Sequence, residues 1–214
     1  MRRSRIAMAA MGLMIAPSAQ ARPVSYPDAW TLIQKTDRQS TSLWVHYTLT
    51  PKWSVGARSE WDRQDDFVFN GLQATYLAKR WFGENYQANV YGFGGIGVTS
   101  PVGDATFDTG ASGFVGVLAD WETRRLFTSY RARYFEADGL DGRFMQAARV
   151  GWAPYEGDTG DLHTWLMLEV DHRPDNSEEI GVTPLVRFFK GSALFEMGWS
   201  VTDDEPLINF TYRF

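Results

Sequence analysis

The last nine residues of the chain, PLINFTYRF at positions 206–214, decide how the rest of the sequence is interpreted. Apolar or aromatic side chains occupy one parity of this stretch, at Ile208, Phe210, Tyr212 and Phe214. The residues between them are mostly polar. Because successive side chains of a β-strand point to opposite faces, this alternation predicts a strand with one apolar and one polar face.

The composition excludes one way of crossing a membrane and permits another. The chain has 214 residues, no cysteine and a formal net charge of −5, and its mean hydropathy is −0.31. Beyond the N-terminal leader it has no apolar run of about 18 residues, which a membrane-spanning helix needs. A β-barrel can span a membrane with such a composition, because only alternate residues of each strand face lipid. The aromatic content of 15% suits the girdles of such a barrel.

The N-terminus has the pattern of a secretory signal peptide. Arginines at positions 2, 3 and 5 precede an apolar segment over residues 6–16, and Ala19-Gln20-Ala21 matches the small-x-small cleavage pattern. We therefore expect cleavage after Ala21, with residues 1–21 removed. Residues 22–28 contain two prolines and are expected to form a short periplasmic lead-in, and residues 29–214 a single barrel domain.

Between the lead-in and the C-terminus, runs of alternating apolar and polar residues are separated by short polar breaks. The runs predict an all-β fold, an antiparallel up-and-down transmembrane barrel of about twelve strands, and single-chain bacterial barrels have an even strand number. Ten strands is the alternative if the first run is not a strand. The expected ranges are 29–36, 41–49, 53–61, 67–81, 87–99, 107–121, 125–136, 142–153, 162–172, 180–189, 192–202 and 206–214.

Charged residues within these runs lie mainly on the parity opposite the apolar side chains. An arginine that faces lipid at the middle of a membrane costs roughly 2–4 kcal/mol, so we expect this parity to face the lumen. In the run 67–81 the same reasoning places Gln73, Thr75 and Lys79 inside. Because the loops are short, we expect any selectivity to come from the wall. The expected lumen and selectivity residues are Arg58, Glu60, Arg131, Arg133, Arg149, Glu169, Asp171, Arg187 and Glu196.

Two interpretations of this charged lumen stay open at this point. The charges can form the selectivity girdle of a polar pore, or they can cross-brace the interior of a narrow barrel. Twelve strands lie between the side-chain-filled barrels of about eight strands and the open porins of about sixteen. Acidic residues also gather in the breaks that we assign to the outer side, which predicts an acidic outer rim.

The C-terminal stretch resembles the assembly signal of bacterial outer-membrane barrels, an apolar-alternating last strand that ends in phenylalanine. Ile208, Phe210, Tyr212 and Phe214 carry this resemblance. It implies location in the outer membrane of a Gram-negative bacterium, recognition by the barrel assembly machinery, and contact with membrane lipids and lipopolysaccharide. With the leader and the alternating runs, the chain is similar to small porin-like barrels, including solute-specific channels for nucleosides or acidic sugars.

Other sequence motifs give weaker evidence of function than the C-terminal strand and the lumen charges do. His46 and Thr48 resemble the His-x-Ser pair of the outer-membrane phospholipase family, although threonine replaces serine and the pair lies on the interior parity. Residues 92–97 match the dinucleotide pattern GxGxxG, but that pattern requires a strand that opens into a helix. Within a strand we expect these glycines to allow close neighbours, curvature, or an aromatic ring packed across them. The three histidines are too dispersed for a metal site. No cofactor and no nucleic-acid partner are expected.

The sequence therefore supports three functions in decreasing order. The first is a narrow outer-membrane channel for ions or small polar solutes, filtered by the lumen charges. The second is a closed structural or surface-interaction barrel that uses its acidic outer rim. The third is a lipid-modifying enzyme that uses His46 and Thr48, and we expect no enzymatic activity in the first two cases.

Overall fold

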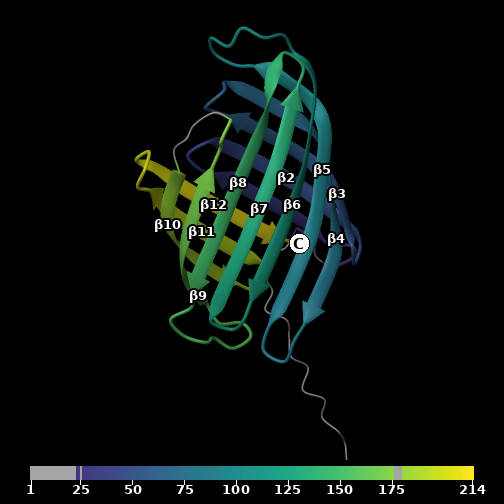
Figure 1. The fold of residues 1–214 in the computed structure, drawn as a ribbon. Helices are drawn as coiled ribbons and strands as arrows, with labels where there is room; N and C mark the ends of the chain where they lie inside the picture. Colours follow the sequence, from purple (N-terminus) through teal and green to yellow (C-terminus); the bar gives the residue numbers. More distant parts are fainter. Residues whose placement is uncertain (1–22, 25, 176–179) are drawn as a thin grey trace, which may run out of the picture.

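The computed structural model describes residues 23–24, 26–175 and 180–214. In these residues twelve β-strands form one closed barrel, in which each strand pairs with its sequence neighbours and β1 pairs with β12 (Figure 1). No helix in these ranges is long and apolar enough to cross a membrane. The expected signal peptide, residues 1–21, lies outside the described residues. The predicted barrel class and the strand number of about twelve are confirmed, and the ten-strand alternative is wrong.

The strand bounds follow the predicted ranges to within a few residues, because each alternating run of sequence forms one strand. The strands are β1 Trp30–Thr36, β2 Ser40–Thr50, β3 Trp53–Asp62, β4 Phe67–Phe82, β5 Gln87–Pro101, β6 Gly110–Glu122, β7 Leu126–Ala137, β8 Leu140–Trp152, β9 His163–His172, β10 Ile180–Lys190, β11 Ala193–Ser200 and β12 Glu205–Arg213.

The first and last strands close the barrel. β1 and β12 pair antiparallel, with Leu32 opposite Tyr212. At the end of this ladder the Trp30 N–H donates to the Phe214 carbonyl at 2.9 Å, and the Phe214 N–H donates to the Trp30 carbonyl at 3.0 Å. Closure leaves no unpaired strand edge. It also places the start of β1 and the C-terminus at one end of the barrel, here called the terminal end; the opposite end is the far end.

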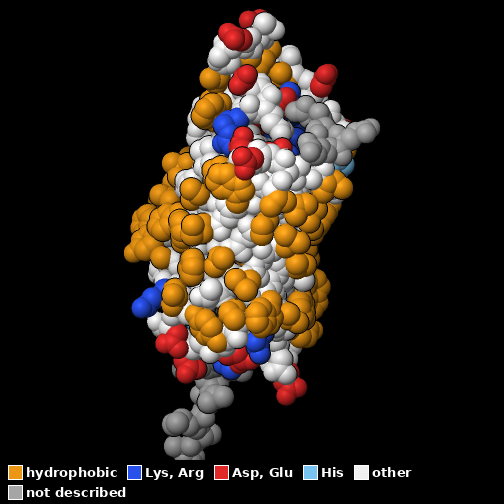
Figure 2. Space-filling view, turned by 90° about the vertical axis from the view of Figure 1, so that its left-hand side faces the viewer, with side chains coloured by type: hydrophobic (Ala, Val, Ile, Leu, Met, Phe, Trp, Pro, Cys, Tyr) orange, Lys and Arg blue, Asp and Glu red, His pale blue; other side chains and the backbone are white. Residues whose placement is uncertain are grey.

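The exterior of the wall is apolar. The outward positions carry large exposed side chains, such as Leu72 (59% exposed), Ile96 (75%) and Val115 (64%). Figure 2 shows hydrophobic side chains spread over the wall, with acidic and basic side chains gathered towards its two ends. An apolar band between polar ends is what a membrane-spanning barrel presents to lipid. The fold and this wall confirm the resemblance to small outer-membrane β-barrels.

A β-bulge on β4 overturns one expected orientation. The register between β4 and β5 shifts between Leu77 and Lys79. An extra residue in one strand reverses the faces that follow it. Lys79 is therefore exposed on the outside, where its ammonium lies 5.8 Å from the Trp81 ring centroid. Arg80 takes the inward position and donates to Asn89 Oδ1 at 2.6 Å. The expectation that Lys79 faces the lumen was wrong, because the alternation in sequence does not reveal the bulge.

Two glycines of β5, Gly95 and Gly97, pack against aromatic rings, which is one of the roles expected for glycines in this strand. A Cβ added to Gly95 would lie 2.5 Å from Phe114 Cζ, and one added to Gly97 would lie 2.8 Å from Phe69 Cε2. Phe69 and Phe114 belong to a buried interior cluster with Phe67, Phe135 and Ala137. A side chain at either glycine would force these rings to move. The interior is therefore not purely polar, because aromatic packing fills part of it.

Candidate functional site: a charged lumen

The first ion-pair cluster inside the barrel is centred on Glu60 of β3. Arg58 Nε donates to Glu60 Oε2 at 2.8 Å. Arg133 lies on β7, which β4, β5 and β6 separate from β3, and it donates to both carboxylate oxygens of Glu60. Arg58 also reaches Gln73 Oε1 at 3.3 Å. Because the partners stand on separated parts of the wall, the cluster braces the barrel across its interior.

A second cluster is centred on Glu196 of β11, which is fully buried. Arg187 Nε donates to its carboxylate at 2.6 Å, and Asn209 Nδ2 does so at 2.7 Å. Arg149 of β8 reaches both oxygens of Glu196 at 3.0 Å and also pairs with Glu169 of β9. A carboxylate without these donors would be very costly to bury. The sequence places residues of five strands, β8 to β12, in one network, and every donor sits on the predicted interior parity.

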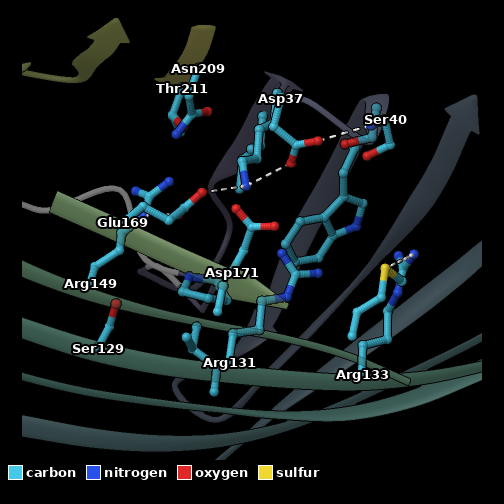
Figure 3. A pocket seen from close by; sticks show the side chains of 18 of the residues that line it. Asp37, Ser40, Ser129, Arg131, Arg133, Arg149, Glu169, Asp171, Asn209 and Thr211 are labelled. Carbon is cyan, nitrogen blue, oxygen red and sulfur yellow. Dashed lines mark hydrogen bonds and ion pairs between the residues drawn. The ribbon is translucent and has the colours of Figure 1, made fainter. Parts of the chain in front are cut away.

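A cavity of about 280 Å³ lies in the interior, lined by residues of both clusters. Arg131 of β7 projects into it, with Arg149 and Glu169 to one side and Arg133 to the other (Figure 3). Arg131 makes no ion pair with any residue that the structure describes; its guanidinium carbon lies 5.0 Å from the centre of the Phe93 ring. The cavity therefore presents a guanidinium that no carboxylate neutralises directly.

Lys35 and Asp37 connect this cavity to the far end. The Lys35 ammonium lies 2.9 Å from the Asp37 carboxylate and 3.6 Å from that of Glu169. Burial raises the pKa of Asp37, but the Lys35 ammonium and the N–H groups of Ser40 and Gln39 outweigh it and hold this pKa below its ordinary value. Asp37 is thus ionised at neutral pH and fixed beside the cavity.

At the far end, an arginine just beyond the end of β9 turns inward. Arg173 follows β9 and is only 1% exposed; it reaches Asp62 at 2.6 Å and Asp65 at 3.2 Å. β9 and β3 lie on opposite sides of the closed ring, so this pair spans the mouth. Arg143 adds a contact to Asp65 at 2.8 Å. The sequence analysis expected the loops to be too short to enter the lumen, so that any selectivity would come from the wall; Arg173 shows that a side chain from a loop also reaches across the mouth, and the source of selectivity stays a prediction.

Arg38, in the turn between β1 and β2, extends the same layer. It reaches Asp171 and Asp203, each at 2.8 Å. Burial lowers the pKa of Arg38, but these two carboxylates outweigh it and raise this pKa above its ordinary value. Arg63 pairs with Glu205 at 3.1 Å. Some of the acidic residues that were expected to form an exposed outer rim are thus turned towards arginines. We call the inward-turned charged residues of this end the far-end layer: Arg38, Asp62, Arg63, Asp65, Arg143, Asp171, Arg173, Asp203 and Glu205.

The structure places all nine expected lumen residues on the interior side of the wall, and all of them except Arg131 in ion pairs. The sequence analysis missed the inward role of Arg38 and Arg173. A basic residue within two positions of a strand end, in a break that also holds acidic residues, is the sequence signal that both share.

The weak catalytic candidates lie together on β2 but lack a catalytic arrangement. His46 and Thr48 are both fully buried and face the interior. His46 stacks on Trp44 with ring centroids 4.0 Å apart, and neither ring nitrogen has a hydrogen-bond partner among the described residues. A catalytic histidine needs a nucleophile on one nitrogen and an orienting group on the other. The geometry therefore gives no support to hydrolysis at this pair.

The residues of the expected assembly signal face outward. Ile208, Phe210 and Tyr212 are each about two-fifths exposed on β12, and Phe214 is 64% exposed. The rings of Phe210, Tyr212 and Phe214 stack in series, with centroids 6.5 Å and 6.0 Å apart. Their recognition by assembly machinery stays a prediction.

Comparison with known proteins gives a likeness to solved structures alone. No protein-family model and no curated protein matches it. Among solved structures it is similar to a KdgM porin in complex with disordered oligogalacturonate, with a TM-score of 0.47 and 9% sequence identity over 86% of this chain and 96% of that one. It is also similar to a KdgM porin, with a TM-score of 0.47 and 10% identity over 87% and 98% of the two chains. Likeness at this level does not identify what this chain carries.

Proposed function

We propose that this protein is an outer-membrane β-barrel that acts as a narrow channel for ions and small polar solutes, with small anions preferred in its central cavity. The apolar wall supports insertion into a bilayer. By analogy with bacterial barrels, the terminal end faces the periplasm and the far end faces the outside. Lipids, lipopolysaccharide and the assembly machinery are the expected partners of the wall and of β12.

The observation that carries this proposal is the position of the Arg131 side chain. It faces a cavity of about 280 Å³ without a carboxylate partner among residues 23–24, 26–175 and 180–214, whereas Arg133 on the same strand is bound to Glu60. Inside a barrel the effective dielectric constant is below that of water, so an uncompensated guanidinium attracts anions strongly. A purely structural interior has no need of an unpaired cation. A solute held there would meet Arg131 as its first counter-charge.

The ion pairs that cross the lumen set the size of the solute. Glu60 and Arg133 span the interior between β3 and β7, and Arg173 and Asp62 span the far end. Such braces leave room beside them for ions and small molecules, not for folded or bulky ones. Solute passage is therefore expected to be slow and sensitive to rearrangement of these pairs.

A closed structural barrel is the second candidate, because the same braces favour it. The hypothesis that such a closed barrel binds partners through a rim of free carboxylates has less support, since Asp62 and Asp65 are held by arginines of the far-end layer. No contact of His46 or Thr48 favours a lipid-modifying enzyme.

The test is single-channel recording of refolded residues 22–214 in planar bilayers, with heat-modifiable gel mobility as the control for folding. We expect discrete steps whose reversal potential in a salt gradient indicates anion preference. Arg131→Gln should weaken that preference. Arg124→Gln is the matched control, because Arg124 lies in an exposed turn with its side chain 76% exposed. A folded barrel that never conducts would favour the closed structural barrel.

A further inference from the structure

The segment that precedes β1 enters the terminal end of the barrel. Val24 is only 1% exposed and packs in one buried cluster with Leu77 of β4 and Tyr91 of β5. Leu118 of β6 packs against the same cluster. These three partners stand on the wall well away from β1, the strand into which the segment leads. The chain therefore crosses the mouth before it joins the wall.

Polar contacts fix both sides of this crossing. Ser54 Oγ, from a fully buried residue, donates to the Pro23 carbonyl at 2.7 Å. Towards β1, the Asp28 N–H donates to the Thr48 carbonyl at 3.0 Å, and the Tyr47 hydroxyl donates to Asp28 Oδ1 at 2.6 Å. The segment is thus held by β2 and β3 as well as by its apolar contact.

The segment also borders the central cavity. Pro23 is among the residues that line the cavity, together with Arg58 and Arg131. On the outer side of the crossing, the Arg213 guanidinium carbon lies 5.8 Å from the centre of the Tyr26 ring. Pro23 and Val24 therefore lie between the cavity and the terminal end, where a solute would have to pass.

We infer that Pro23, Val24 and residues 26–28 form a plug that closes the terminal end of the lumen and must move before a solute can pass. We call these residues the N-terminal plug. The part of the plug inside the lumen, Pro23 and Val24, is suited to release, because one apolar contact and one hydrogen bond anchor it, while the wall beside it is held by complete strand ladders. Low-stability elements of this kind are the ones that open locally.

The experiment uses thiol reactivity, which does not depend on conduction. The natural chain has no cysteine, so Ser129→Cys, at a residue that lines the cavity, introduces a single reporter. A small maleimide is added to the refolded protein in detergent and the labelling rate is measured. Val24→Asp places a carboxylate in an apolar contact and should release the plug. We expect labelling to become about tenfold faster or more, because release raises the population of the open state.

Two further variants define the result. Leu162→Asp adds the same charge at an exposed side chain near the terminal end and should leave the rate unchanged. Ser54→Ala removes the hydrogen bond to Pro23 and should give an intermediate increase, which keeps the test valid if Val24→Asp does not fold. Equal rates in the parent and in the folded Val24→Asp or Ser54→Ala variants would overturn the plug. Faster labelling in a barrel that never conducts would keep the plug and overturn the channel.

Discussion

The two ends of this barrel are obstructed by different chemistry. At the far end, charged side chains reach across the mouth, as in the pair between Arg173 and Asp62 at 2.6 Å. At the terminal end, the obstruction is a segment of backbone seated by Val24 against Leu77 and Tyr91. The far end therefore depends on charge compensation in a desolvated layer, and the terminal end on apolar burial. Salt, pH and point substitutions should separate the two.

The largest effect on the free energy of unfolding is expected from Arg173→Met. Removing one partner of a buried ion pair leaves an uncompensated charge and costs about 3–5 kcal/mol. Asp62, at 1% exposure, would be left in that position. The free energy of unfolding, measured by urea titration in detergent with gel mobility as the readout, should fall by that amount. Arg124→Met, at an exposed turn, should change it little. An equally small change for Arg173→Met would mean that the far end is not a desolvated layer.

At the terminal end, Val24→Ala is expected to lower the free energy of unfolding by a smaller amount. Two buried methyl groups are lost, at about 0.8 kcal/mol for each carbon, so the loss should be about 1.5 kcal/mol. Because the contact is apolar, this loss should be the same at about 0.1 M and about 1 M NaCl. The half-exposed pair of Arg63 and Glu205 should weaken over the same range. A salt-dependent effect of Val24→Ala would show that charge, not burial, seats the plug.

Acid should loosen the far end, where Asp37 is ionised beside Lys35. The pKa of Asp37 is below its ordinary value in the folded protein, so its contribution is present above the ordinary pKa of aspartate, about 3.9, and is lost as the pH falls further. The free energy of unfolding should therefore decline below about pH 4. Asp37→Asn should lower stability at neutral pH and flatten this decline. A decline of unchanged slope in Asp37→Asn would assign the acid sensitivity to the carboxylates of the far-end layer instead.

Alternation and charge parity were enough to predict the closed barrel, its strand ranges and the inward direction of all nine expected lumen residues. Both signals act within a strand, where a side chain's face depends only on its position in the alternation. The partners inside the lumen were not predictable in this way. That Arg133 binds Glu60 while Arg131 stays unpaired depends on the tilt and register of strands that are distant in sequence.

The structures at the two ends could not be predicted from the sequence pattern, for a related reason. Arg173 and Val24 lie outside the strands, so alternation does not assign them a face. Arg173 follows β9 in an acidic loop and resembles an ordinary solvated arginine. Val24 lies in a proline-containing lead-in that has no periodicity of its own. Only the closed ring brings Arg173 to Asp62 and Val24 to Tyr91.

The smallest effect on the free energy of unfolding is expected on the outer surface, at the β-bulge of β4 that turns Lys79 outward instead of into the lumen. Lys79 lies outside and over Trp81, at 5.8 Å from the ring centroid, and an exposed cation–π contact is worth about 0.5–1 kcal/mol. Lys79→Met should therefore lower the free energy of unfolding by no more than that, and it should leave the labelling rate of a cysteine in the cavity unchanged. Arg80→Met, on the inward side of the same bulge, should cost more, because it removes the shorter of the two hydrogen bonds to the buried Asn89 Oδ1 and leaves only that from Gln87 Nε2 at 3.2 Å. The reverse order of the two effects would mean that β4 keeps its alternation through residues 77–80 and that the lysine faces the lumen.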